Sequence, residues 1–426
     1  MTSESLQASR GTHDIWGTEI RLWQFLEQHA RRILGQANYQ EIRTPIFEAT
    51  ELFNRGIGEG TDIVSKEMYT FTDRGERSLT LRPEGTAGVV RSLIEHKRLQ
   101  QGVQRCWYQG AMFRYERPQA GRQRQFHQLG VEVFGSDDPR SDVEVIALGL
   151  EFLEALGLSH LTLELNSVGD PEDRQRYKAA LVDYLTPYAS DLDPDSQVRL
   201  TKNPLRILDS KNPATQKILA EAPQLPEYLG QDSQRHFERV QSGLTALGLA
   251  YELNPRLVRG LDYYTRTAFE ITTRELGAQS AVGGGGRYDQ LVQELGGSAT
   301  PAVGWAMGLE RLVGLLQKRG ETPAPDLDFY IATQGEGTAN LSLQITQMLR
   351  RHGLRVEMDV SQSALGKQIK RADKLGCQAC VIVGESEVAT GDITVKWLAT
   401  GVQELVAFPS GFSDSAVWRQ KLRPNP

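Results

Sequence analysis

Apolar residues recur at helical spacing near the start of the chain and predict one long amphipathic helix over residues 19–37. The positions that form its apolar face are Ile20, Trp23, Leu26, Ala30, Ile33 and Leu34. Residues 41–52 (EIRTPIFEATEL) are predicted to form a strand that Pro45 interrupts. A second helix is expected over residues 83–100, because its opening proline is favoured in the first turn of a helix.

From residue 105 onward apolar and polar positions alternate, which is typical of strands. The runs RCWYQGAMFRYE (105–116) and QFHQLGVEVFG (125–135) are predicted to pair as antiparallel strands around the polar loop RPQAGRQR. Residues 141–156 return to helical spacing. Strands are expected again at 266–273 and 278–283. A glycine-rich turn, GGGGRYD, and a strand-to-helix unit, PAVGWAMGLERLVGLLQ, should follow them.

Residues 171–250 are polar and helix-leaning, and prolines punctuate them. These prolines are Pro171, Pro187, Pro194, Pro204, Pro213, Pro223 and Pro226. We interpret this stretch as a helical module inserted between parts of one catalytic domain. The segment KRGETPAPD (318–326) has the composition of a linker, and strands alternate with helices after it, which predicts a small α/β domain with a largely parallel sheet.

The sequence therefore predicts two domains. Residues 1–325 should form an α+β catalytic domain on a mainly antiparallel sheet, with the helical insertion at about 171–250. Residues 326–426 should form the C-terminal α/β domain.

The composition limits the classes of function. A chain of 426 residues with 39% apolar and 24% charged residues is typical of a soluble globular protein of two or three domains. No window approaches the ~18–20 apolar residues of a membrane span, and the start of the chain lacks the apolar region of a secretory signal. The three cysteines suit a reducing cytoplasm. A net charge of −6 argues against non-specific polyanion binding by the whole surface, so a nucleic-acid site would be a local basic patch.

The predicted hairpin can present several polar side chains on one sheet face. Phe126, Gln128 and Glu132 lie two or four residues apart and share a face, and so do Arg114 and Glu116 on the first strand. A solvated antiparallel face is the alternative, but it would leave Phe126 exposed.

Basic residues are concentrated in and beside the hairpin loop. Five arginines fall between residues 105 and 124, and they include Arg117 and Arg122. Arginine suits bidentate phosphate contacts, although a solvated run of charge is the other interpretation.

The run VRGLDYYTRTAFE (258–270) places Arg259, Asp262, Tyr263 and Tyr264 among apolar residues. Buried polar groups are unfavourable unless they are paired, so a ligand could supply some of the partners. The alternative is a core strand with two ordinary tyrosines. Because Arg259 and Tyr264 have opposite strand parity, both can reach one site only if the chain turns between them, and we expect that turn at Gly260.

Two features of the C-terminal domain have both a functional and a structural interpretation. Four basic residues share one predicted helical face, either as phosphate contacts or as a solvated surface: Lys367, Lys370, Arg371 and Lys374. Cys377 and Cys380 have the spacing of a redox or zinc pair, but they directly precede a buried-looking strand and no cysteine-rich partner motif exists. We expect no function for this pair.

Several strings together resemble class II aminoacyl-tRNA synthetases. FRYE with RQFHQLGVEVFG is similar to the second signature motif of that class, GWAMGLERL to the third, and RTPIFEATELF more weakly to the first. LRPEGTAG, GGGGRYD and VRGLDYY resemble the amino-acid loop and the histidine-specific strings of histidyl-tRNA synthetases. The resemblance covers nearly the whole chain in order.

The resemblance implies a role for each matching residue. Arg114 and Arg259 would bind the α-phosphate of ATP from opposite sides and are the expected catalytic residues. Glu116 would contact the adenine, Phe126 would stack on it, and Arg311 would clamp the γ-phosphate. The implied histidine-binding set is Glu84, Thr86, Arg114, Gln128, Glu132, Arg259, Tyr263, Tyr264 and Tyr288.

Within this set, Glu84 and Thr86 would hold the α-ammonium group, although Glu84 also fits a simple helix start. Tyr264 with Glu132 would hydrogen bond the imidazole, which has one donor and one acceptor nitrogen, and Tyr288 would lie close to it. Arg117, Arg122 and the basic stripe of the C-terminal domain are the candidate tRNA contacts.

The implied reaction joins L-histidine to the 3′ end of tRNA(His) with ATP, through histidyl-adenylate, with Mg²⁺ on the phosphates. The resemblance also implies an anticodon-binding C-terminal domain, a cytoplasmic homodimer with Pro45 at its interface, and no membrane partner. The sequence indicates no particular Mg²⁺ ligand. Two alternatives are a regulatory paralogue that serves ATP phosphoribosyltransferase, which would typically lack the C-terminal domain, and a tRNA-binding module without catalysis.

Overall fold

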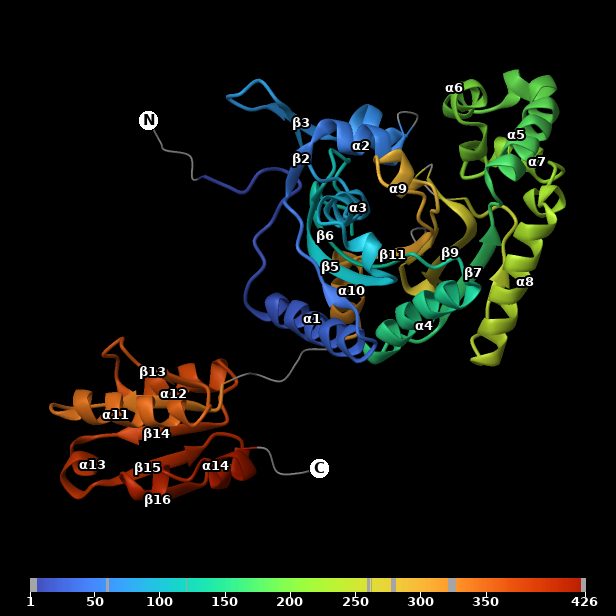
Figure 1. Cartoon of the computed structure of the whole chain (residues 1–426). Coiled ribbons are helices and arrows are strands. Elements are labelled where there is room, and N and C mark those ends of the chain that lie inside the picture. The colour runs from blue at the N-terminus through green and yellow to red at the C-terminus, as the bar shows by residue number, and fades with distance from the viewer. Residues whose placement is uncertain are drawn as a thin grey trace, which may run out of the picture. The chain divides into compact units, whose positions relative to one another are not determined.

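The computed structural model describes residues 6–58, 61–119, 121–258, 261, 263–276, 281–320 and 327–422. The chain forms two compact units, Met1–Thr322 and Pro323–Pro426 (Figure 1). The expected boundary between residues 325 and 326 lies three residues beyond the observed one. In the described part of the chain, no helix is both long and apolar enough to span a membrane.

The first unit is built on an eight-stranded sheet. In order across the sheet its strands are β1 (Gln40–Glu41), β5 (Gln104–Phe113), β6 (Gln125–Phe134), β11 (Ala302–Gly308), β10 (Ala281–Arg287), β9 (Thr265–Thr273), β7 (Leu161–Ser167) and β8 (Glu252–Leu253). Neighbouring strands are antiparallel except in the two outermost pairs, β1 with β5 and β7 with β8. The mainly antiparallel sheet that the alternating pattern predicts is confirmed.

Three helices cover one face of this sheet: α1 (Thr18–Gln36), α4 (Pro139–Ala155) and α10 (Leu309–Lys318) (Figure 1). Their apolar sides form one core with strand residues such as Val131 and Trp305. The indole of Trp305 donates a 2.8 Å hydrogen bond to the carbonyl of Val145 on α4. Because side chains alternate along a strand, Glu132 and Gly304 belong to the opposite, open face.

The helices α2 (Thr50–Ile57), α3 (Thr86–Glu95) and α9 (Leu291–Glu294) lie on the other side, near a small sheet of β2 (Phe47–Ala49), β4 (Ser78–Leu81) and β3 (Tyr69–Thr72) (Figure 1). The predicted strand over residues 41–52 is therefore wrong at its end, where α2 begins. Leu52, Phe53 and Ile57 share one side of α2, and burying that side against α3 stabilises a helix there.

The predicted glycine-rich turn is also wrong, because Gly283–Gly286 lie inside strand β10. A Cβ on Gly285 would lie 2.0 Å from the carbonyl oxygen of Gly304, and one on Gly286 would lie 2.3 Å from that of Thr267. The glycines thus allow the two neighbouring strands to approach β10 closely, which is a known use of glycine in a strand.

The insertion consists of α5 (Pro171–Leu185), α6 (Pro194–Lys202), the 3₁₀ turn η4 (Pro204–Ile207), α7 (Pro213–Leu219) and α8 (Gln231–Ala246) (Figure 1). Prolines occupy the first position of α5, α6 and α7. An Asp or Asn side chain caps each of these helices: Asp170, Asp193 and Asn212. Pro171, Pro194 and Pro213 therefore begin helices.

The second unit has a five-stranded sheet in the order β13 (Val356–Met358), β12 (Phe329–Thr333), β14 (Ala379–Val383), β15 (Asp392–Trp397) and β16 (Gln403–Ala407). Its helices are α11 (Thr338–Arg351), α12 (Leu365–Lys374), α13 (Glu385–Thr390) and α14 (Ser415–Leu422). The first three strands are parallel, but β15 and β16 are antiparallel. A largely parallel sheet is correct only for the strands that helices α11 and α12 connect.

Candidate active site

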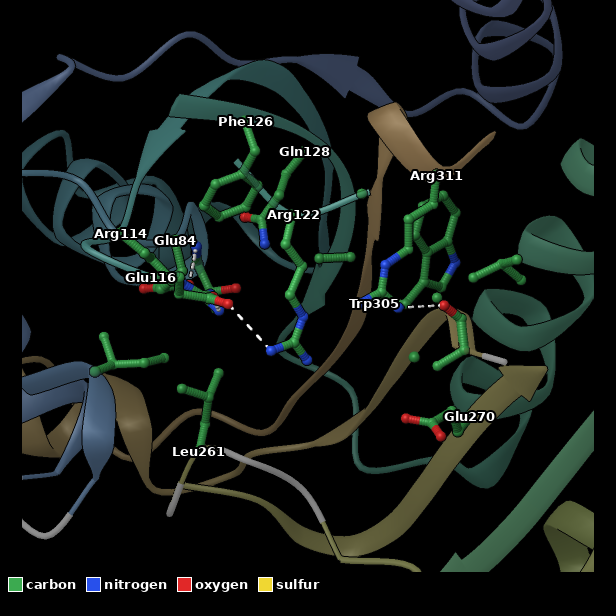
Figure 2. Close-up of a pocket in the computed structure, with 18 of the residues that line it drawn as sticks. Glu84, Arg114, Glu116, Arg122, Phe126, Gln128, Leu261, Glu270, Trp305 and Arg311 are labelled. Atoms are coloured by element: carbon green, nitrogen blue, oxygen red, sulfur yellow. Dashed lines mark hydrogen bonds and ion pairs between the residues drawn. The ribbon is translucent and has the colours of Figure 1, made fainter. Parts of the chain in front are cut away.

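The open face of the large sheet carries a cavity of about 470 Å³. It is lined by twelve of the residues that the sequence singled out: Glu84, Thr86, Arg114, Glu116, Arg122, Phe126, Gln128, Glu132, Tyr263, Tyr264, Tyr288 and Arg311. Figure 2 shows side chains of this cavity, with Phe126 and Gln128 projecting from β6 beside Arg122. Residues from six separate segments of the sequence thus meet in one place.

Three expected positions lie outside the described residues: Arg259, Gly260 and Asp262. The expected turn between Arg259 and Tyr264 stays a prediction. Arg117 is not among the residues that line the cavity, and the basic stripe belongs to the second unit.

Glu132 lies at the centre of a buried hydrogen-bond network. It accepts a 2.7 Å bond from the hydroxyl of Thr86 and a second bond from the hydroxyl of Tyr288. Burial raises the pKa of Glu132 to about 8, the two hydrogen bonds oppose the rise, and the charge of Glu84 adds to it. Burial therefore favours the neutral form of this carboxyl.

Glu84 fixes the loop before α3. Its two oxygens accept hydrogen bonds from the backbone N–H groups of Thr86 (2.6 Å) and Ala87 (2.8 Å). Glu84 thus lies before the first turn of α3 and not in it, but its carboxylate accepts from the first N–H groups of the helix while it also lines the cavity. Each carboxylate oxygen has two lone pairs, so Glu84 keeps capacity to accept from a cation.

Gln128 presents an unused acceptor. Its side-chain oxygen is buried and has no hydrogen-bond partner within the described residues. Because buried polar groups are nearly always paired, this oxygen marks a position where a bound donor would be stabilised.

Three tyrosines form one wall of the cavity. The rings of Tyr263 and Tyr264 lie 4.8 Å apart, and that of Tyr288 lies 5.4 Å from Tyr263. Burial and neighbouring acids raise the pKa values of Tyr263 and Tyr288 well above the usual value, so both phenols stay protonated and can donate hydrogen bonds. Tyr263 and Tyr264 are buried, as they would be in a core strand, but they lie just before β9 and line the cavity.

Arg114, Arg122 and Arg311 also line the cavity. Arg114 donates a 2.8 Å hydrogen bond to the carbonyl of Pro83, and its guanidinium lies 5.2 Å from the centre of the Phe126 ring. Arg122 pairs with Glu116 at 3.1 Å (Figure 2). Arg311 donates to the carbonyl of Ala281. Burial and the charge of Arg122 lower the pKa of Arg311, which indicates an environment that would favour an anion.

The prediction that Arg114 and Glu116 share a strand face is wrong in its detail. Strand β5 ends at Phe113, and both residues lie beyond it. Arg114 still donates its backbone N–H to the carbonyl of Arg124, but the next two backbone donors turn away: that of Tyr115 to Glu67 and that of Glu116 back to Arg114. Both side chains nevertheless line the cavity.

The sequence motifs did not indicate several residues that also line the cavity, among them Asp62, Glu67, Arg206 and Glu310. Glu310 accepts hydrogen bonds from the backbone and the ring of His127, which fixes the start of α10 against β6. Its position next to Arg311 was the available signal. Asp62 and Arg206 carried no local signal, since they belong to different modules.

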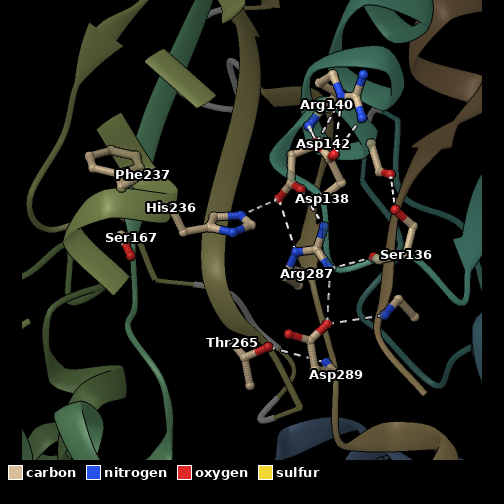
Figure 3. A network of polar contacts seen from close by, with 12 residues as sticks. Ser136, Asp138, Arg140, Asp142, Ser167, His236, Phe237, Thr265, Arg287 and Asp289 are labelled. Atoms are coloured by element: carbon tan, nitrogen blue, oxygen red, sulfur yellow. Dashed lines mark hydrogen bonds and ion pairs between the residues drawn. The ribbon is translucent and has the colours of Figure 1, made fainter. Parts of the chain in front are cut away.

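Two neighbouring residues of GGGGRYD have different surroundings: Arg287 forms buried ion pairs, and Tyr288 lines the cavity. Arg287 is fully buried and pairs with Asp142 of α4 and with Asp289, and it also donates to the carbonyl of Ser136 (Figure 3). His236 of α8 lies 3.3 Å from Asp142 on the other side. Burial raises the pKa of Asp142, but the charge of Arg287 and its hydrogen bonds outweigh this effect and lower it to about 2.

The second unit presents its predicted residues separately. The side chains of Lys367, Lys370, Arg371 and Lys374 are exposed on α12. Cys377 and Cys380 are buried and unbridged, and burial raises the pKa of each thiol to about 12. Thiols with such pKa values are poor nucleophiles and metal ligands at neutral pH. In the described part of the chain, no group of three or more metal-ligating side chains occurs.

The whole chain is similar to known proteins. A family model for histidyl-tRNA synthetase matches residues 11–172 and 175–312, and one for an anticodon binding domain matches residues 328–411. The histidine–tRNA ligase of Cyanothece sp. is 63% identical over 419 residues, which cover 98% of both chains. That of Picosynechococcus sp. is 61% identical over 420 residues, or 98% of this chain and 99% of the relative.

Solved structures agree with these matches. The crystal structure of apo S. aureus histidyl-tRNA synthetase has a TM-score of 0.81 at 37% identity and covers 96% of this chain and 99% of that chain. A Bacillus halodurans structure is described as an ATP phosphoribosyltransferase regulatory subunit/histidyl-tRNA synthetase. It has a TM-score of 0.67 at 19% identity, with coverage of 90% and 99%, and this likeness concerns the fold alone.

Proposed function

The chain belongs to the histidyl-tRNA synthetase family, and from that premise we propose which of its residues carry out the reaction. The activity is the ATP-dependent ligation of L-histidine to the 3′ end of tRNA(His) through a histidyl-adenylate intermediate. A carboxylate oxygen of histidine attacks the α-phosphorus of ATP, and pyrophosphate leaves with the bonding electron pair. A terminal hydroxyl of the tRNA then attacks the acyl carbon, and AMP leaves.

Positioning and charge neutralisation are the main requirements of the first step, since the substrate itself is the nucleophile. We propose that Arg114 and Arg259 bind the α-phosphate. Arg114 is held for this role by its hydrogen bond to the carbonyl of Pro83. The observation that carries the proposal is that a buried carboxyl network and several arginines line one cavity.

The adenine end is assigned to three residues. Phe126 lies on β6 and lines the cavity, where its ring offers an aromatic surface for a base. The guanidinium of Arg114 lies near the same ring. Glu116 would contact the adenine, and Arg311 would hold the γ-phosphate. Arg122 lines the cavity between them and can pair with a phosphate as well as with Glu116.

The imidazole end is assigned to Glu132, Tyr264 and Tyr288. A carboxylate accepts from one ring nitrogen, and a phenol donates to the other. A site built on these bonds rejects analogues that lack them, because its buried groups would be left unpaired. Glu84, Thr86 and Gln128 would accept from the α-ammonium group. Thr86 can do so while its own proton is donated to Glu132.

Magnesium is proposed as the cofactor of ATP. Glu270 lines the cavity and would hold this ion, since one or two carboxylates together with substrate phosphates are its usual environment. Bound magnesium would neutralise charge on the phosphates.

Transfer and assembly complete the proposal. We assign anticodon binding to the second unit, with phosphate contacts from the exposed basic side of α12, and further tRNA contacts to Arg117 and Arg122.

A homodimer is proposed because Ile46, Phe47 and Phe71 are about half exposed beside Pro45, where a second copy would cover them. The enzyme is proposed to be cytoplasmic, as its unbridged cysteines suit a reducing compartment.

Histidine-dependent ATP–pyrophosphate exchange tests activation, and charging of tRNA(His) tests transfer. Both activities are expected. A folded protein without exchange would contradict the assignment of the cavity, and exchange without charging would contradict the assignment of the second unit.

A further inference from the structure

Asp62, on the rim of the cavity, faces two arginines of the helical insertion. Its Oδ2 lies 3.4 Å from Nη1 of Arg206 and 3.5 Å from Nη2 of Arg199. Arg199 also donates a 3.3 Å hydrogen bond to the carbonyl of Arg206, which links the two basic residues. Asp62 and Arg199 are 137 positions apart in the sequence, so this contact joins two modules.

Arg206 is held firmly on the insertion side. The next residues, Ile207 and Leu208, are buried in the same apolar cluster as Tyr263, Tyr264 and Tyr288. The Arg206 side chain is only 17% exposed, and its Nε is buried with no hydrogen-bond partner in the described part of the chain. Arg206 therefore projects from a rigid base into the cavity, although it belongs to the inserted module.

The rim that contains Asp62 is fixed at its other end by the hairpin. Glu67, the last residue of η1 (Ile63–Glu67), accepts a 2.8 Å hydrogen bond at its carbonyl from the backbone of Tyr115. Asp62, Ile63 and Glu67 all line the cavity. Residues 61–67 thus form a rim segment that is held at both ends. The hairpin binds it through Glu67, and the insertion binds it through the ion pairs of Asp62.

We propose that Arg206 is a positioning residue, which holds residues 61–67 over the cavity through Asp62 and thereby lets the insertion module determine how well the enclosed histidyl-adenylate is protected. The inference rests on the proposed function. The adenylate is a mixed anhydride, and water that reaches its acyl carbon breaks the bond to the phosphate oxygen and yields histidine and AMP. Excluding water from a closed site prevents such side reactions.

The test uses the full-length enzyme with Arg206→Gln and Asp62→Asn. Both changes remove the ion pair between Asp62 and Arg206, and Asp62→Asn also removes the pairs of Asp62 with Arg199 and Lys66. AMP release without tRNA and the KM for histidine should therefore rise about five- to tenfold, as expected for the loss of roughly 1 kcal/mol of rim support. The kcat for pyrophosphate exchange should change much less, because neither residue is assigned to the reacting atoms.

Three comparisons separate this role from a general structural one. The double variant should be no worse than Asp62→Asn alone, because Arg206 acts through Asp62, which also pairs with Arg199 and Lys66. Arg206→Lys keeps the charge and should restore AMP release to near the wild-type level. Arg235→Gln removes an exposed ion pair of the same module, with Asp232 on α8, and should have no effect.

The outcomes are distinct. A wild-type enzyme without exchange would refute the proposed function itself. An active wild type with unchanged AMP release in both single variants, or with additive effects in the double variant, would refute only this inference. If Arg206→Gln fails to fold, Asp62→Asn decides alone, since Asp62 is 39% exposed and its amide keeps the same shape.

Discussion

The hydroxyl of Thr86 donates a 2.7 Å hydrogen bond to the carboxyl group of Glu132, and both side chains are buried. Thr86 comes from the start of α3 and Glu132 from the middle of β6. This bond connects the two ends of the proposed histidine site, because Thr86 is assigned to the α-ammonium group and Glu132 to the imidazole. A change at either residue should therefore affect recognition of the whole amino acid.

Replacing Thr86 with valine keeps the shape of the side chain but removes its hydroxyl. Loss of this hydroxyl leaves the buried carboxyl of Glu132 without one of its partners, which costs about 1–3 kcal/mol, so the KM for histidine in pyrophosphate exchange should rise about 5- to 100-fold. The KM for ATP should change little. Thr86→Ser keeps the hydroxyl and serves as the control, and a valine variant with a histidine KM within twofold of wild type would contradict the network.

Glu132 should make the stability of the ligand-free enzyme depend on pH. Its pKa is raised from 4.5 to about 8, so the folded state holds this proton more tightly than the unfolded state. The resulting stabilisation is fully present below pH 4.5 and is lost as the pH rises through 8. Glu132→Gln cannot titrate and should lose less stability over this interval, by on the order of a few kcal/mol.

Urea unfolding of both proteins at pH 5 and pH 8.5, without histidine, measures this difference. Curves that shift equally with pH in the two proteins would show that Glu132 does not hold the extra proton.

Arg259 is predicted to act on the α-phosphate. Loss of one fixed positive group should reduce adenylate formation about 10²–10³-fold, because such groups stabilise charge that develops in the transition state. Arg259→Ala should keep the circular dichroism spectrum of the wild type. Arg274→Ala, at an exposed position after β9, is the matched control. Unchanged exchange in a folded Arg259 variant would remove this residue from the mechanism.

The buried pair of Arg287 and Asp142 should be essential for stability. Arg287→Met leaves the Asp142 carboxylate without its main partner and should lower the free energy of unfolding by about 3–5 kcal/mol. Adding Asp142→Asn should recover part of the loss. Arg140 pairs with Asp138 with a side chain that is 90% exposed, so Arg140→Met should leave the free energy of unfolding nearly unchanged. Equal effects of Arg287→Met and Arg140→Met would refute the distinction.

Removing the basic residues of α12 should weaken tRNA binding without changing the activation of histidine. Changing Lys367, Lys370 and Lys374 together to glutamine should raise the KM for tRNA and make charging less sensitive to salt, since fewer counterions are displaced on binding. Pyrophosphate exchange needs no tRNA and should stay at the wild-type rate. A triple variant that charges tRNA with the wild-type KM would show that this side is only a solvated surface.

Local patterns in the sequence were sufficient for much of the fold. The spacing of Trp23, Leu26 and Ile33 predicted α1, and alternation predicted the β5–β6 hairpin with Phe126, Gln128 and Glu132 on one face. These predictions succeeded because helix and strand periods are local properties that burial of one face enforces. The strings that resemble synthetase motifs also contain many of the side chains that line the cavity, among them Glu84, Arg114 and Glu132.

Tertiary structure decided what depends on neighbours distant in the sequence. Gly285 looked like part of a turn, but it lies in β10, paired with β11 and β9. It is a glycine because the adjacent chain at Gly304 comes too close for a side chain. Arg287 and Tyr288 are adjacent in one string, yet one is tied to Asp142 and the other to Glu132. Which partners meet across the sheet cannot follow from local periodicity.

The rim contact between Asp62 and Arg206 makes the same point most clearly. No local pattern marks either residue, because an ion pair between modules depends on how two separately folded segments pack. The sequence by itself determined the chemistry of the site through its motifs and the elements that carry them. Only packing over the sheet decided which side chains face the cavity, which serve as its internal supports, and that the inserted module takes part in it.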